Sequence, residues 1–162
     1  MRKTTTGSRQ LSALVETAPS TPYKLTVLML PALHDSSYQW AGICFRESGT
    51  GRLVTIGSVF EGIGGGAAGF VNWSKWTNAT TQFGSAQDRK TQCHSGPIWF
   101  EIEADGTNIK LRWGMDGENW MDEYSEAKNT FFTTAPDEIG LFVVAEAGTL
   151  DAAMTVVSYE KH

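Results

Sequence analysis

The sequence predicts an all-β protein, a two-sheet antiparallel β-sandwich of the jelly-roll type with an extended N-terminal arm. Three observations support this. Short runs of alternating polar and apolar residues recur along the chain, glycine-rich turn signals separate them, and no segment keeps a helical period over three turns. The length of 162 residues suits one domain with a sizeable core.

The clearest strand pair lies within residues 98–120, where alternating residues flank Asp105 and Gly106 and predict a β-hairpin. Pairing Ala104 with Ile109 sets its register. The predicted apolar pairs are Phe100 with Trp113 and Ile102 with Leu111, and the predicted charged pairs are Glu101 with Arg112 and Glu103 with Lys110. One register satisfies both faces, and a slip of one residue would spoil both.

The other strands are inferred from similar apolar runs. In chain order they are expected at residues 23–31, 40–46, 52–60, 70–73, 118–124, 139–145 and 152–159. The glycine-rich residues 61–69 are expected to form a flexible connection. Their letters match part of a dinucleotide-binding fingerprint, but no helical pattern follows them, so no cofactor is expected. Residues 74–97 are expected to be polar and irregular.

The N-terminal residues differ in composition from the rest of the chain. Residues 1–22 carry Arg2, Lys3 and Arg9 against Glu16, a local charge of +2, so the remainder of a chain with net charge −5 carries −7. We expect residues 1–22 to be an extended or flexible arm that docks through its basic residues, and residues 23–162 to be the folded domain. The acidic body argues against nucleic acid as a partner.

Signals for targeting, membranes and metals are weak. The N-terminus has no apolar segment typical of a secretory signal, and no run is long enough to span a membrane. Cys44 and Cys93 form no disulfide framework or metal motif, so reduced thiols are expected, with a single bridge as the alternative. The histidines are too scattered to predict a metal site.

Three segments of the chain carry a family resemblance. The elements GICFRESGTGRLVTIG, WFEIEADGTNIKLRWGMDGENW and PDEIGLFVVAEAG, followed by a closing apolar strand, resemble concanavalin A-like lectin/glucanase domains. The chain is similar to the short versions found in bacteriophage virion proteins, over residues 23–160. The resemblance implies a jelly roll that serves as a structural part, binds glycans or assists adhesion, and some relatives are glycosidases.

A glycosidase would need two carboxyl groups at a suitable separation, and Glu101, Glu103 and Asp105 alternate along one strand face. The sequence departs from the laminarinase-type pattern at its central and final positions. The predicted register also places Arg112 and Lys110 opposite the glutamates, whereas a general acid needs a raised pKa. We therefore expect no catalytic residues, with Glu101 and Glu103 as the alternative.

A binding role would rest on the aromatic residues, because sugar rings stack on aromatic faces. Trp113 is expected in the core. Trp73 lies just before the polar segment 74–97 and Trp76 lies near its start, so both are expected to be exposed, and Trp99 shares a face with Glu101. These three tryptophans are the predicted ligand or partner contacts. Packing in the core is the alternative for each.

Together these features predict a non-enzymatic structural protein of a virion, made without a signal peptide. Its expected partners are other virion proteins and a surface glycan, with a homotrimer as the expected assembly. Both capsid decoration and a tail or fibre module agree with the resemblance. A lectin outside a virion is the alternative.

Overall fold

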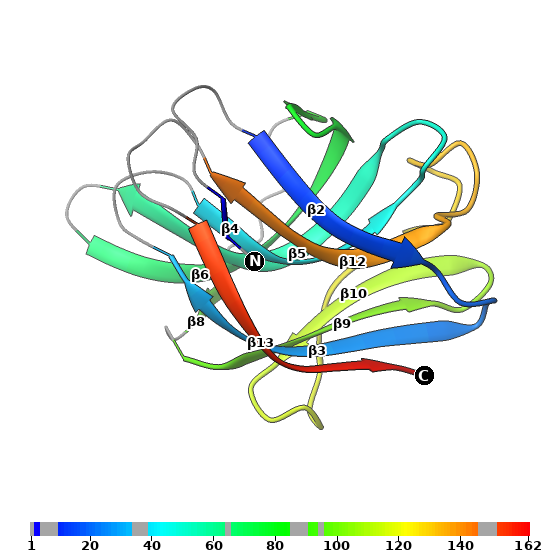
Figure 1. Cartoon of the computed structure of the whole chain (residues 1–162). Helices are drawn as coiled ribbons and strands as arrows, with labels where there is room; N and C mark the ends of the chain where they lie inside the picture. The colour runs from blue at the N-terminus through cyan, green and yellow to red at the C-terminus, as the bar shows by residue number, and fades with distance from the viewer. Residues whose placement is uncertain are drawn as a thin grey trace.

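The computed structural model describes residues 2–3, 10–33, 39–63, 66–84, 91–93, 96–145 and 152–162. Two antiparallel sheets pack against one another, as Figure 1 shows, which confirms the predicted all-β sandwich. The described residues contain no helix, and therefore none that could cross a membrane.

We name the two layers sheet A and sheet B. The strands of sheet A are β1 (Arg2–Lys3), β3 (Tyr23–Ala32), β9 (Ile98–Ala104), β10 (Asn108–Gly114), β11 (Met121–Ala127) and β13 (Ala152–Lys161). Those of sheet B are β2 (Gln10–Thr17), β4 (Gln39–Arg46), β5 (Leu53–Ile63), β6 (Gly66–Asn78), β7 (Thr81–Gln82), β8 (Thr91–Cys93) and β12 (Glu138–Ala145). Sheet A runs in the order β1-β13-β3-β9-β10-β11, and sheet B in the order β2-β12-β4-β5-β6-β7, with β8 paired to β6.

The β9–β10 hairpin has the predicted register. Ala104 pairs with Ile109, and both the apolar and the charged pairs follow as expected. Asp105 forms the turn, because its Oδ1 accepts the backbone N–H groups of Thr107 at 2.9 Å and Asn108 at 2.7 Å. Gly106 has φ +93°, a conformation that favours glycine. The strand pairing and the turn residues therefore specify the same β9–β10 hairpin.

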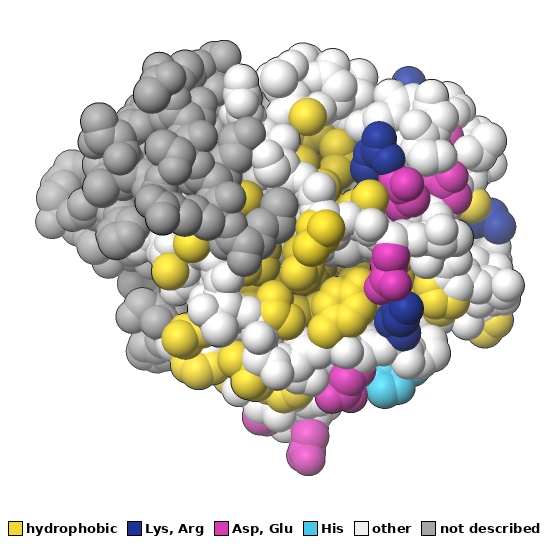
Figure 2. Space-filling view, in the orientation of Figure 1, with side chains coloured by type: hydrophobic (Ala, Val, Ile, Leu, Met, Phe, Trp, Pro, Cys, Tyr) yellow, Lys and Arg dark blue, Asp and Glu magenta, His cyan; other side chains and the backbone are white. Residues whose placement is uncertain are grey.

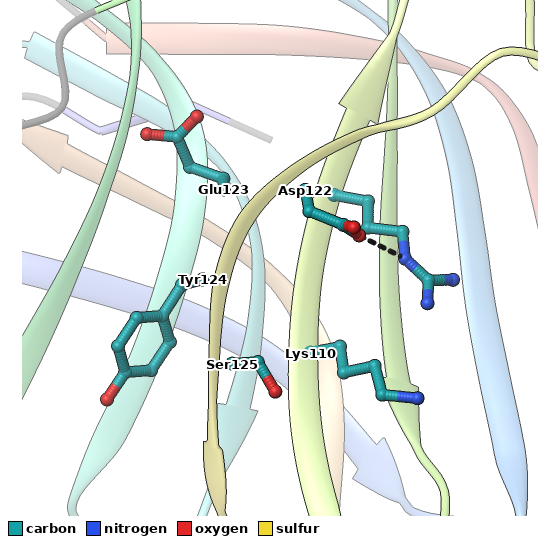
Figure 3. A pocket seen from close by; sticks show the side chains of 6 residues that line it. Lys110, Asp122, Glu123, Tyr124 and Ser125 are labelled. Atoms are coloured by element: carbon teal, nitrogen blue, oxygen red, sulfur yellow. Dashed lines mark hydrogen bonds and ion pairs between the residues drawn. The ribbon is translucent and has the colours of Figure 1, made fainter.

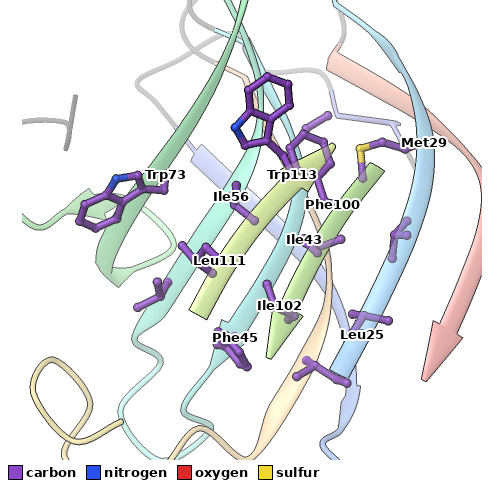
Figure 4. Close-up of a cluster of buried hydrophobic side chains, with 14 of the residues drawn as sticks. Leu25, Met29, Ile43, Phe45, Ile56, Trp73, Phe100, Ile102, Leu111 and Trp113 are labelled. Atoms are coloured by element: carbon purple, nitrogen blue, oxygen red, sulfur yellow. The ribbon is translucent and has the colours of Figure 1, made fainter. Parts of the chain in front are cut away.

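The main core lies between the two sheets (Figure 4). From sheet A it receives Phe100, Ile102 and Leu111, all fully buried, and Trp113 with 4% exposure. Ile43 on β4 belongs to the facing set from sheet B. These apolar side chains bury one face of each sheet, and the opposite face of sheet A carries its charged residues together with Trp99 and Leu28.

The glycine-rich connection is shorter than predicted. β5 and β6 form one long hairpin in which Glu61 pairs with Ala68 and Ile63 with Gly66. Residues 61–63 and 66–69 are therefore strand, and the expectation of a loop throughout 61–69 is wrong for them. Backbone hydrogen bonds of the hairpin extend through residues whose small side chains supply little hydrophobic signal.

The proposed arm is also partly wrong. Residues 10–17 form β2, which pairs with β12 along its whole length, from Gln10 opposite Ala145 to Thr17 opposite Glu138. The folded domain therefore begins before residue 23. Leu11, 5% exposed, is anchored in a core, so at least part of the basic N-terminal segment belongs to the sandwich.

A second hydrophobic core lies on the other face of sheet B. Alternate residues of β4 separate the two cores, with Ile43 in the main core and Trp40 in the second. The buried members of the second core are Leu11, Trp40, Cys44, Leu53, Val59, Trp76, Phe142 and Val144. The Leu11 N–H donates to the carbonyl of Ala79 at 2.7 Å, linking β2 to the turn after β6. Sheet B therefore curls around this core.

Candidate functional site

The structure separates the three predicted tryptophan contacts. Trp76 is fully buried in the second core, where its ring lies edge-on to Trp40 at 5.4 Å and its Nε1 donates to Ser74 Oγ at 2.8 Å. Trp73 is 8% exposed and stacks on Tyr124 with ring centroids 3.6 Å apart. The expectation that these two rings are exposed is wrong, because β6 is covered on both faces.

Trp99 does lie on the outer face of sheet A, where it pairs with Leu28 and Gly114. It is partly buried, because the loop that follows β10 packs on its ring. A Cβ atom on Gly117 would lie 2.9 Å from Trp99 Cε2, so glycine, at φ +78°, allows this contact. Part of the Trp99 ring is therefore accessible on the outer face, and Trp99 stays a predicted ligand contact.

Next to Trp99 on the same face is a set of ion-paired side chains, which we call the charge ladder. Its members are Lys24, Glu101, Glu103, Asp105, Lys110, Arg112 and Asp122. They come from β3, β9, β10, β11 and the turn between β9 and β10. Adjacent antiparallel strands place these residues side by side on one face.

Arg112 is the centre of the charge ladder. Its Nη1 lies 2.7 Å from Glu101 and 2.8 Å from Glu103, and its Nε lies 2.8 Å from Asp122. Lys110 Nζ lies 3.1 Å from Glu103 and 2.9 Å from Asp105. Because several carboxylates hold each cation in place, the donors and acceptors on this face have fixed positions.

This pairing bears on the catalytic alternative. Partial burial opposes ionisation of Glu103, but the hydrogen bond from Lys110 and the charges of Arg112 and Lys24 outweigh it and lower its pKa. The pKa of Asp105 is also lowered, first by the backbone N–H of Asn108 and then by Lys110. A general acid in a glycosidase needs the opposite shift. Neither residue is suited to donate a proton near neutral pH.

A shallow pocket opens beside the charge ladder at a β-bulge in β11. Leu111 pairs with Tyr124 and Arg112 with Asp122, which leaves Glu123 as the extra residue. The pocket has a volume of about 490 Å³, and Figure 3 shows its lining. The lining residues are Lys110, Arg112, Asp122, Glu123, Tyr124 and Ser125. Asp122 and Ser125 add exposed polar groups to the ladder side of this pocket.

Sequence reasoning predicted the β9–β10 part of this site and missed the rest. Lys24 and Ser125 were not predicted, and neither was the contact of Asp122 with Arg112, because these residues join the site only through the β3–β9 and β10–β11 pairings. Alternation in residues 23–31 would have placed Lys24 on one strand face. The bulge that shifts β11 has no comparable signal in the sequence.

A second depression has a different character. It lies at the opening between the sheets, has a volume of about 250 Å³ and is lined by Leu14, Val15, Glu16, Leu141 and Tyr159. Figure 2 shows hydrophobic side chains gathered along this side of the molecule. Leu14 is 65% exposed. Tyr159 and Lys161 both bind Glu16, so charged and aromatic groups border the cleft.

The remaining predicted residues have mixed outcomes. Arg2 and Lys3 lie in β1, whose backbone pairs with β13, while Arg9 lies outside the described residues. Their docking role stays a prediction. Cys44 is a free, buried thiol, and burial raises its pKa to about 12. Among the described residues no group of three or more His, Cys, Asp or Glu side chains could hold a metal ion.

Comparisons with known proteins identify a fold. No protein-family model matches the chain, and no curated protein does. A functionally unknown protein from Saccharomyces cerevisiae is 13% identical with a TM-score of 0.58, over 93% of this chain and 72% of that one. The CBM2 module of the evolved Dit from Lactobacillus casei BL23 phage J-1 is 8% identical with a TM-score of 0.59, over 92% and 68%.

Part of a longer protein has the same architecture. The GH43 protein BlXynB from Bacillus licheniformis is 13% identical with a TM-score of 0.57, over 93% of this chain but only 29% of its own length. At these identities the likeness establishes a shared β-sandwich fold and nothing about function. Function has to be argued from the site.

Proposed function

We propose that this protein is a non-catalytic, lectin-like module of a bacteriophage particle that binds carbohydrate through the outer face of sheet A. The proposal rests on the arrangement of side chains on this face. A pocket of about 490 Å³ and an array of fixed polar groups lie on the sheet face that also carries Trp99. The phage Dit module, named as a CBM2 module, has a similar fold over 92% of this chain and supports the placement.

The chemistry of the face suits sugars. Each sugar hydroxyl can donate and accept a hydrogen bond, and the carboxylates of Glu103 and Asp122 offer acceptors while Arg112 and Lys110 offer donors. The accessible part of Trp99 adds an aromatic surface for the C–H groups of a ring. Such sites combine a few fixed polar groups with an apolar surface.

The proposal excludes catalysis because the ladder carboxylates have structural partners. Glu101 is 5% exposed and bound to Arg112, and Glu103 is shared between Arg112 and Lys110. Two carboxylates held this way serve as scaffolding for the face. We therefore propose adhesion without hydrolysis.

The proposed setting is a virion, on the capsid or at a tail or fibre. There the module would contact other virion proteins and assemble as a homotrimer, with a host-surface glycan as its ligand. Immunogold electron microscopy of purified phage particles that carry the gene would test this setting. Absence of label from capsid and tail would contradict it, and the position of the gene beside capsid or tail genes would separate the two placements.

The binding role is tested with a glycan array followed by titration calorimetry. Trp99→Ala and Asp122→Asn should each weaken binding to the best array glycan by about tenfold, a typical effect of losing one good contact. Asp122 is 84% exposed at its side chain, so its variant should fold normally. Leu14→Ala, in the separate cleft, is the matched control. No array signal, or equal affinities for all four proteins, would overturn the proposed site.

The catalytic alternative has its own assay. Release of reducing sugar from the bound glycan should be absent. Activity that disappears in Glu101→Gln or Glu103→Gln would contradict the proposal and favour a hydrolase.

A further inference from the structure

We infer that the outer face of sheet A selects neutral glycans and rejects acidic ones. The inference rests on the proposed carbohydrate-binding role and adds the charge class of the ligand. It follows from how the cations of the charge ladder are paired and from the sign of the charge that remains.

The described cations of the charge ladder are all in contact with carboxylates. Arg112 contacts three of them, Glu101, Glu103 and Asp122, at 2.7–2.8 Å. Lys110 contacts Glu103 and Asp105 at 3.1 and 2.9 Å. An acidic sugar would have to displace a carboxylate that already has short contacts and is covalently held in the sheet. The entropy of immobilising a free ligand favours the resident carboxylate.

Lys24 is the most exposed cation of the charge ladder, with a side chain 43% exposed. Its Nζ lies 3.7 Å from Glu101 and 3.5 Å from Glu103. Lys24 is therefore close to two carboxylates. An approaching anion would be repelled by these carboxylates as well as attracted by the ammonium group.

The remaining charge has the wrong sign for an acidic ligand. The charge ladder contains four carboxylates, Glu101, Glu103, Asp105 and Asp122, against three cations, Lys24, Lys110 and Arg112, so its formal charge is −1. The whole chain carries −5. Long-range repulsion thus adds to the local effect and slows the approach of a polyanion.

Neutral hydroxyl groups meet none of these obstacles. A carboxylate that already accepts from arginine has lone pairs left for a sugar hydroxyl, and a guanidinium has five N–H donors in total. Ser125 lies at the edge of the pocket and adds an uncharged hydroxyl. A neutral ring can therefore add hydrogen bonds to the face without breaking an ion pair.

The test compares two sets of immobilised polysaccharides. Dextran, galactan and mannan are the neutral probes, and polygalacturonate and hyaluronate are the acidic ones, each measured at about 20 and 200 mM NaCl. The full chain should bind at least one neutral probe with an affinity that changes less than twofold between these salt concentrations, and neither acidic probe. Binding to an acidic probe alone would overturn this inference and leave the carbohydrate-binding role standing. Binding to neither set would overturn both.

Substitutions in the charge ladder test whether its carboxylates cause the rejection of acidic glycans. Glu101→Gln combined with Glu103→Gln changes the formal charge of the ladder from −1 to +1 and frees contacts on Arg112. This variant should bind polygalacturonate at least tenfold more tightly than the parent, with strong salt dependence. Asp122→Asn should show a smaller gain in affinity for polygalacturonate. Because the Asp122 side chain is 84% exposed, this variant can replace the double variant if the latter does not fold. Glu16→Gln, in the cleft between the sheets, is the control matched to Asp122→Asn, because each substitution removes one negative charge. Equal gains in the control and the ladder variants, or no gain in folded ladder variants, would contradict the role of the ladder.

Discussion

Thr134 donates both its backbone N–H and its hydroxyl to one oxygen of Glu47, at 2.6 and 2.8 Å, although the two residues are 87 positions apart. Thr133 donates to the same oxygen, and Thr50 donates to the other. Glu47 is 2% exposed, so this carboxylate ties the turn after β4 to the segment before β12 from inside the fold.

This contact predicts acid sensitivity. Burial opposes ionisation of Glu47, but hydrogen bonds from Thr133, Thr50 and Thr134 outweigh it and lower its pKa to about 2. A carboxyl whose folded pKa lies below its unfolded value stabilises the protein above the unfolded value of about 4.3, and this contribution is lost as the pH falls toward 2. Glu47→Gln should lower the free energy of unfolding by about 1–3 kcal/mol at pH 7.

Urea unfolding at several pH values checks this prediction. The difference between the parent and Glu47→Gln should shrink as the pH falls from about 4.5 to about 2.5. Glu118→Gln, at an exposed position, is the control and should match the parent throughout. A difference that stays constant across this range would contradict the assignment.

Glycine at position 42 is predicted to be irreplaceable. Gly42 pairs with Gly57, and a Cβ on Gly42 would lie 2.0 Å from the carbonyl oxygen of Ile56. Gly42→Ala should therefore lower the free energy of unfolding by at least about 2 kcal/mol, the scale of overpacking in a core. Gly49→Ala, where a Cβ would meet nothing within 4 Å, is the matched control and should be near neutral. Equal stabilities in thermal unfolding would refute this account.

Trp76 is predicted to stabilise the fold. It is fully buried and packs on Trp40, so Trp76→Ala should lower the free energy of unfolding by roughly 3–5 kcal/mol. This reverses the expectation for an exposed contact, whose removal would leave folding intact. Leu14→Ala, at a residue 65% exposed, is the control in differential scanning calorimetry. A melting temperature unchanged by Trp76→Ala would show that the ring does not support the second core.

Deletion of residues 1–22 is predicted to damage the domain. It removes β2, which leaves β12 without one partner strand and uncovers Phe142 and Val144 in the second core. The shortened protein should aggregate or melt at a lower temperature than a variant that lacks only residues 1–9 and keeps β2. Size-exclusion chromatography with circular dichroism would compare the two. Equal melting temperatures would restore the idea of a separable arm.

Much of the fold could be predicted because strong local patterns specify it. The β9–β10 register rests on neighbours joined by a short turn, where Asp105 and Gly106 set the turn and the two faces agree on the pairing. The strand over residues 10–17 was missed, although Leu11, Ala13 and Val15 alternate within it. Its serine and threonine neighbours resemble a flexible terminus, and only pairing with β12 makes it part of the sheet.

In the candidate site, too, local patterns could be predicted and contacts between distant strands could not. The sequence by itself determined which residues share a strand face, and hence that Glu101, Glu103, Lys110 and Arg112 would meet. It did not determine what covers a face, because periodicity carries no information on packing partners from distant strands. Only the tertiary structure decided that Trp73 and Trp76 are buried. It also brought Lys24 to Glu101 and Asp122 to Arg112, through strand pairings that the hydrophobic pattern alone does not specify.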